Sequence, residues 1–337
     1  MPQTSGSCSA FSGANGLLQA LIDFCCADAG PGRDWTLKLD QNSKGSDGIT
    51  DAFPEDNLRE VILKNTGLSG NEQILIGIRE WKYVAGNAWG WDLNGYLDVP
   101  SSWAGNKNDT GFTSYDSTWK HWASGTTSGL PILQLFDSTM YYWIYSTKER
   151  IVVIVKVGSS YFACYLGLGY RLGSPSEYPF PLLVAGSWFG NRSYQAGGYG
   201  PVRPIAGSFF VVSPGNLFRT GSTPRVIPMQ GDSDNRAIDV APNGKGLLLP
   251  CYVLADGDLL MSLQGVYAPR MLSMQSEDLY EAAEGDFRIF QQAAETYNYS
   301  FMAVQEETEE TTTTEDATTT TEEETTTTEE ETTTSGE

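Results

Sequence analysis

The chain has a single histidine, His121, in the segment WKHWASG. A Ser–His–Asp triad, a Cys–His pair or a histidine-based metal site would each have to use it. None of the residues that flank it in this segment is a carboxylate or a cysteine. We therefore predict that His121 is a loop side chain and that the protein is not an enzyme of these classes.

Two aspartates in the segment GDSDNRAID, Asp232 and Asp234, have the spacing of the first and third ligands of a calcium loop. Arg236 stands where the fifth ligand should be, and the glycine that such loops need at the sixth position is missing. A cation would be repelled by that arginine. The segment therefore predicts a solvated turn and not a metal site.

Cofactor and glycosidase patterns are also absent from the sequence. Gly167 and Gly169 have the wrong spacing for a dinucleotide fingerprint, no helix is expected after them, and there is no P-loop. A glycosidase would need two carboxylates roughly 5–9.5 Å apart across a cleft, and nothing singles out such a pair. We predict no catalytic residue and no cofactor, and a carboxylate-based hydrolase is the least favoured function.

Two segments set aromatic side chains among Gly, Ser and Asn, at residues 101–130 and 187–200. Tyr and Trp on such loops provide large contact areas at low entropic cost, which suits protein interfaces, and they also stack on sugars. The other possibility is that these rings fold back onto a sheet. The candidate interface residues are Trp103, Trp119, Trp122, Trp188, Tyr194 and Tyr199.

The formal charge of −21 is unevenly distributed. Residues 306–337 hold 13 acidic and no basic side chains, which leaves 29 acidic against 21 basic side chains in the rest, a net charge of −8. Acidic surfaces repel a phosphate backbone, so direct nucleic-acid binding is not expected. The tail repeats Thr and Glu with a period of seven but lacks apolar coiled-coil positions, so we expect it to be disordered in isolation.

The five cysteines are odd in number and include no CxxC pair, which predicts reduced thiols and not a disulfide framework. The first 30 residues contain no Lys or Arg, so no secretory signal is expected. No apolar run approaches the roughly 18 residues of a membrane span. Together these features predict a protein that folds in a cytoplasm and has no membrane partner.

The elements that carry these segments are expected to be mainly strands. Residues 14–30 form a predicted helix, because Leu17, Leu21 and Cys25 recur at helical spacing. Elsewhere, short apolar or alternating runs between Gly-containing turns predict antiparallel meanders or sandwich-like sheets. The predicted division is an α+β module at 1–100, a Ser/Gly/Trp-rich loop at 101–130, a mainly β module at 131–305 and the acidic tail at 306–337.

The strongest pattern lies between residues 138 and 169. Residues 141–145, 151–157 and 161–168 are predicted to be sequential antiparallel strands joined by short turns. RIVVIVKV is almost continuously apolar, so both faces of this middle strand should be covered. The three prolines of SPSEYPFPLLVAGS (residues 174–187) predict an extended crossover over the sheet and not a central strand.

Several segments, in this order, resemble a family of tailed-bacteriophage virion proteins: WTLKLDQ, EQILIGIREWKYV, WGWDLNGYL, the block at residues 131–187, LQGVYAP and FRIFQQAAETYNYSFMAVQ. The resemblance spans roughly residues 34–305. Its most specific part is the YYW strand, the RIVVIVKV strand and the EYPFPL crossover. Members of this family are described mostly as structural, and the resemblance transfers no active-site residue to this chain.

What the resemblance implies is a structural component of a phage virion, on the tail or baseplate side, that acts through protein–protein interfaces. We expect a symmetric homo-oligomer that is assembled in the host cytoplasm and contacts other virion structural proteins. A neck, collar or capsid-surface protein is one alternative, because no residue distinguishes tail from head. A receptor-binding protein that holds glycan through the aromatic loops is another.

Overall fold

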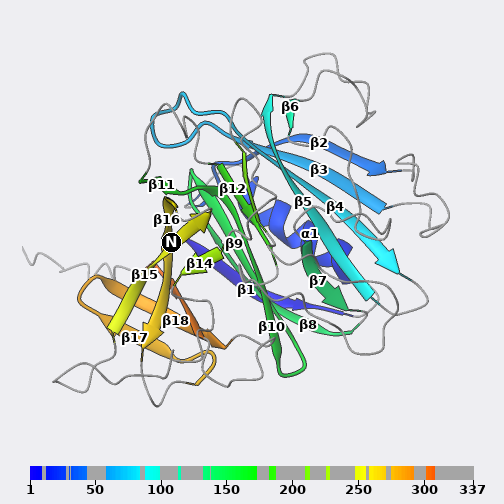
Figure 1. Ribbon diagram of the computed structural model, residues 1–337. Coiled ribbons are helices and arrows are strands. Elements are labelled where there is room, and N and C mark those ends of the chain that lie inside the picture. The colour runs from blue at the N-terminus through cyan, green and yellow to red at the C-terminus, as the bar shows by residue number, and fades with distance from the viewer. Residues whose placement is uncertain are drawn as a thin grey trace, which may run out of the picture. The chain divides into compact units, whose positions relative to one another are not determined.

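The computed structural model describes a body of mostly β-structure (Figure 1). The described residues are 1–9, 13–27, 30, 32–43, 58–83, 88–98, 113–114, 132–136, 138–172, 182–186, 209–212, 225–227, 247–255, 258–270, 275–291 and 301–307. All of them belong to one compact unit, which runs from Met1 to Glu307. Of the acidic tail predicted at residues 306–337, Glu306 and Glu307 are described and belong to this unit, and the expected disorder of the remaining residues lies outside the described part of the chain.

The described strands form three antiparallel sheets, here called A, B and C. Sheet A has the order β1 (Gln3–Cys8), β8 (Met140–Ser146), β9 (Arg150–Val157), β10 (Ser160–Leu168), β12 (Leu182–Ala185) and β13 (Phe209–Val212). Sheet B has the order β2 (Thr36–Ser43), β3 (Leu58–Asn65), β4 (Ile74–Tyr83), β5 (Ala88–Asp98) and β6 (Thr113–Ser114), and β7 (Ile132–Phe136) also pairs with β5.

Sheet C lies toward the C-terminal end of the described chain. Its order is β14 (Arg225–Ile227), β15 (Leu247–Ala255), β16 (Asp258–Arg270), β19 (Phe301–Gln305), β18 (Gly285–Gln291) and β17 (Leu279–Ala282), and β11 (Tyr170–Arg171) also pairs with β16. The helix α1 spans Gly13–Cys25 and buries Leu17, Leu21 and Cys25. The predicted fold class, mainly β with antiparallel sheets and an N-terminal helix, is confirmed.

Sheet A is the middle layer, because its strands contribute to two separate apolar cores (Figure 1). In β9, Ile151 and Val153 join the core shared with sheet B and α1, whereas Val152 and Ile154 join the core shared with sheet C. The continuous apolar run of this strand is therefore explained by burial on both faces. The three predicted meander strands pair antiparallel as β8, β9 and β10, which confirms that prediction.

One prediction for the central sheet is wrong. Residues 174–187 were expected to cross over the sheet and not to form a central strand, but Leu182–Ala185 forms β12 and pairs on both sides, with β10 and with β13. The part of the segment that holds the prolines lies outside the described residues. All four side chains are buried. The prolines do not prevent this, because β12 starts one residue after Pro181 and its own residues retain their backbone N–H groups.

The chain passes from sheet A to sheet C without a loop, since β10 ends at Leu168 and β11 begins at Tyr170. Gly167 has a φ of +136°, and a Cβ atom there would lie 2.2 Å from the carbonyl oxygen of Glu149. Gly169 faces the Met261 side chain of β16 at a similarly short distance. The two glycines therefore allow the strand to bend and the neighbouring backbone to approach closely.

Strand pairing links sequence regions that were expected to form separate modules. Strand β1 pairs with β8 in sheet A, and β7 pairs with β5 in sheet B. The independent folding of residues 1–100 and 131–305 stays a prediction, but each region supplies a strand to a sheet built mainly by the other. Apart from Thr113–Ser114, the predicted loop at 101–130 lies outside the described residues.

Candidate functional site

None of the side chains predicted as candidates from the sequence falls in the described part of the chain. His121, Asp232 and Asp234 lie outside it, and so do the six loop aromatics Trp103, Trp119, Trp122, Trp188, Tyr194 and Tyr199. Their roles stay predictions. The polar residues that the structure brings together were not singled out from the sequence. Two of their clusters lie at boundaries between sheets, and a third lies within sheet B.

The most extensive cluster lies between sheets A and C and is centred on Glu306, directly after β19. Its carboxylate accepts hydrogen bonds from Nε and Nη2 of Arg288, at 2.6 and 3.1 Å, and from the hydroxyl of Tyr145 at 3.1 Å. The Glu306 side chain is 6% exposed and that of Arg288 is 26% exposed. A two-point contact of this kind fixes both the position and the orientation of the arginine.

Arg288 extends the cluster toward Glu277, in the turn that precedes β17. Its Nη1 donates to the Glu277 carbonyl oxygen at 3.1 Å, and the Glu277 N–H donates to the carbonyl oxygen of Ile289 at 2.6 Å. Glu277 has a φ of 75°, and among the described non-glycine residues no other φ is positive. The left-handed backbone is thus held on both sides, which is how such a conformation persists in a folded protein.

The Glu277 carboxylate completes the cluster on the sheet A side. Its Oε1 accepts from Lys156 Nζ at 2.5 Å and from the Tyr161 hydroxyl at 2.6 Å. Tyr141, Lys156 and Tyr161 are direct cross-strand partners on β8, β9 and β10, so they lie in one row on the face of sheet A that meets sheet C. We call the connected residues Tyr145, Glu306, Arg288, Glu277, Lys156 and Tyr161 the A–C polar chain.

The environment of the A–C polar chain shifts the pKa values of the following four members away from neutral pH. Burial raises the pKa of Tyr145 well above its ordinary value, and burial also raises that of Tyr161. The hydrogen bond to Glu277 raises the pKa of Lys156. Burial acts to raise the pKa of Glu277, but the bonds from Lys156 and Tyr161 outweigh it and lower the net pKa. A general acid or base that works near neutral pH has its pKa shifted toward neutrality, and these four shifts run the other way.

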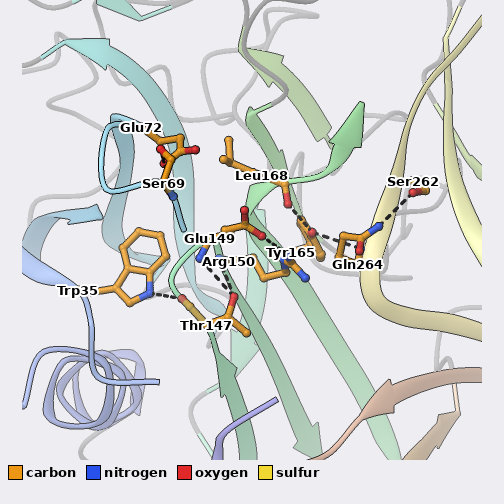
Figure 2. Close-up of polar contacts among 10 residues, drawn as sticks. All are labelled: Trp35, Ser69, Glu72, Thr147, Glu149, Arg150, Tyr165, Leu168, Ser262 and Gln264. Carbon is orange, nitrogen blue, oxygen red and sulfur yellow. Dashed lines mark hydrogen bonds and ion pairs between the residues drawn. The ribbon is translucent and has the colours of Figure 1, made fainter. Parts of the chain in front are cut away.

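A second polar network joins all three sheets at the β8–β9 turn (Figure 2). Trp35, just before β2, donates through Nε1 to the Thr147 carbonyl at 2.8 Å. The Thr147 hydroxyl accepts from the backbone N–H groups of Glu149 and Arg150, which closes the turn. On the other side, the Tyr165 hydroxyl donates to the Leu168 carbonyl at 2.7 Å and accepts from the backbone of Gln264 at 3.5 Å.

A third site is a carboxyl group inside sheet B. Glu80 is 4% exposed, and its Oε2 accepts from the Arg59 backbone N–H at 3.1 Å, whereas its buried Oε1 accepts no hydrogen bond. The Arg59 side chain is engaged by both oxygens of Asp40 at 2.8 Å and by Gln19 of α1 at 2.7 Å. Burial raises the pKa of Glu80 to about 7.

The cysteines show no features of reactive thiols. All five are free, and Cys8, Cys25, Cys164 and Cys251 are buried. Burial raises the pKa of Cys25 to about 12 and that of the partly buried Cys26 to about 11. Because the thiolate is the nucleophile, these groups are chemically quiet at neutral pH.

Two further features are absent from the described residues. Within those residues, His, Cys, Asp and Glu side chains nowhere gather in a group of three that could hold a metal ion. In the same part of the chain, the structure has no helix with the length and apolar character needed to cross a membrane.

The structure thus defines a three-layer, antiparallel β protein in which two of the described polar clusters connect one sheet to another and a third lies within sheet B. No protein-family model matches the chain, and no curated protein matches its sequence. The A–C polar chain carried one sequence signal that could have revealed it. Arg288 interrupts the apolar strand DFRIF, and an arginine in such a position requires an acidic partner.

Proposed function

We propose that the chain is a structural component of a tailed-phage virion, on the tail or baseplate side, that acts through protein–protein interfaces in a symmetric homo-oligomer. The observation that carries this proposal is the double burial of sheet A, which makes the middle layer a scaffold. Two of the described polar clusters connect the layers, as expected of a body whose task is to hold its surfaces in place. The sequence resemblance supports the virion as the location.

Several large apolar side chains remain exposed on the described surface and are available for contacts with neighbouring subunits. Tyr170 of β11 is 63% exposed. Leu172, the residue after β11, donates its backbone N–H to the carbonyl oxygen of Leu260 in β16. The other exposed large apolar residues are Leu68, Tyr141, Leu247, Leu259 and Leu279. Interfaces in permanent assemblies bury side chains of this type.

The test is to purify particles by density gradient, separate heads from tails and quantify this chain in each fraction by mass spectrometry against standards of known copy number. The proposal predicts a fixed copy number, a multiple of the tail symmetry, in the tail fraction. Enrichment in heads would favour the neck or capsid alternative. Absence from washed particles would refute a structural role.

Receptor binding is a second candidate because one described aromatic side chain is exposed beside a cation. Tyr141 is 53% exposed and lies next to Lys156 in the cross-strand row, with the half-buried Trp143 two residues further along β8. Rings beside polar groups can stack on sugars. Adsorption of the purified protein to host cell-wall polysaccharide, lost in Tyr141→Ala and kept in Leu68→Ala, would favour this function over the structural one.

A further inference from the structure

We infer that Glu306 is an anchor residue of the body. We also infer that the A–C polar chain is a latch: it links the packing of sheet C against sheet A to the site at which the acidic tail begins. This inference is independent of where in a virion, or in which assembly, the protein acts. It concerns a residue that belongs to the acidic tail in the sequence but to the body in the structure. Residue 306 was the first residue of the predicted tail.

The backbone on either side of Glu306 is tied to the body. The Glu306 N–H donates to the Asp286 carbonyl at 2.8 Å, and the Glu307 N–H donates to the Met1 carbonyl at 3.1 Å. The Met1 amino group donates in turn to the Gln305 carbonyl at 3.2 Å. The Met1 side chain packs against the apolar core that sheets A and C share. The tail therefore begins at a fixed point on the boundary between the two sheets.

The Glu306 charge is required where it stands. Arg288 is held by Glu306 on one side and contacts the Glu277 carbonyl on the other, so removing the carboxylate charge leaves a largely enclosed cation without its partner. Loss of one member of a buried ion pair is strongly unfavourable, because the remaining charge has lost its hydration. Glu306 thus acts on the Glu277 turn through Arg288.

The two ends of the latch differ in their exposure to solvent. Lys156 and Glu277 are 29% and 35% exposed, so salt screens their attraction, whereas the carboxylate of Glu306 is nearly enclosed. Between the two ends lies the apolar contact of Trp143 and Tyr161 with Phe290, whose ring centroid is 5.1 Å from that of Trp143. The latch should therefore open first at the contact between Lys156 and Glu277. A pulling force on the tail should act first on the contact between Glu306 and Arg288.

The test is hydrogen–deuterium exchange, followed by mass spectrometry, on the full chain and on Glu306→Gln. Backbone amides of β17, β18 and β19 should exchange about tenfold faster in the variant, because local opening of sheet C becomes easier. Protection of α1 and of β3 and β4 should be unchanged. Glu281→Gln is the matched control, since it makes the same change at an exposed site on β17.

A second full-chain variant, Glu277→Gln, tests the connection. In the wild type, exchange in the Glu277 turn should rise with salt concentration, and in this variant it should be faster at low salt and independent of salt. Wild-type exchange of sheet C in Glu306→Gln would overturn the inference. Equal acceleration in all three sheets would also overturn it, because the residue would then support global stability and not the A–C boundary.

Discussion

Glu80 shows how a single side chain can make stability depend on pH near neutrality. Its carboxyl is enclosed in sheet B, where the charges of Arg59 and Asp40 act on it and already bind each other. Burial disfavours the carboxylate, and Asp40 repels it, whereas Arg59 favours it. The net result is a pKa of about 7, against an ordinary value of 4.5.

We expect Glu80→Gln to change the pH dependence of stability. The folded state holds the Glu80 proton more tightly than the unfolded state, so wild-type stability should fall as pH rises from about 4.5 to about 7 and then level off. A neutral amide at position 80 removes this loss, so the variant should be more stable than the wild type above pH 7, by on the order of 3 kcal/mol. Urea unfolding between pH 5 and pH 8 measures it, with the exposed Glu284→Gln as control. Parallel pH profiles for wild type and Glu80→Gln would contradict the expectation.

The bend at Gly167 gives a second prediction for a single residue. Gly167→Ala should destabilise the protein by about 3 kcal/mol, because the new Cβ meets backbone atoms of Glu149 and Arg150 and the φ of +136° is unfavourable for alanine. Gly158→Ala is the control, since Gly158 has a φ of +61° but no atom near its Cβ position, and it should cost only about 1–2 kcal/mol. Chemical denaturation of both variants gives the difference, and equal losses would show that the close approach contributes nothing.

Among the elements, strand β9 contributes side chains to a different apolar core on each of its two faces. Ile151→Ala removes volume from the core shared with sheet B, and Ile154→Ala removes it from the core shared with sheet C. Each should therefore cost about 2–5 kcal/mol of unfolding free energy, since both side chains are fully buried. Leu68→Ala, at a side chain 73% exposed, should change little. If either isoleucine variant proved as stable as that control, one face of β9 would not be packed.

The elements themselves were largely predictable from the sequence, because strands such as β8, β9 and β10 pair with their neighbours along the chain and show their burial in their local pattern. Strand β12 was not predictable in the same way. LLVA is a run of four apolar residues, and nothing in the local sequence distinguishes a crossover from a central strand. Its partner β13 lies far along the chain, after a long segment that is not described. Proline governs its own position and restricts the residue before it, but not the strand that starts after it.

For the whole molecule, the three-layer arrangement lay beyond sequence reasoning. It depends on pairings between distant strands, such as β1 with β8 and β7 with β5, that composition and periodicity do not encode. The A–C polar chain was missed for a related reason. Its six members come from five strands or their ends and from the turn before β17, and Glu306 is hidden at the start of an acidic run in which every glutamate looks alike.

The uneven charge leads to a prediction about assembly. If the proposed virion function holds, deleting residues 308–337, which leaves Glu306 in place, should keep the body folded but reduce its retention on virions, because repeated glutamates can bind cationic surfaces of a neighbouring subunit. Wild-type retention should decline with salt, since the Debye length falls from roughly 10 Å at 0.1 M to about 3 Å at 1 M. Bound copies are counted on particles across a salt series. Equal and salt-independent occupancy of both forms would show that the body surface alone makes the interface.

The pairing of β1 with β8 also has a consequence for synthesis on the ribosome. Gln3 cannot meet Tyr145 until the intervening residues have been made, which takes roughly ten to thirty seconds at typical elongation rates. Throughout that interval β1 is an unpaired strand at risk of joining another nascent chain. Its sequence, QTSGSC, is small and polar, so it can remain hydrated while it waits. The far more apolar β9 has no such delay, because its partners β8 and β10 are its immediate neighbours along the chain.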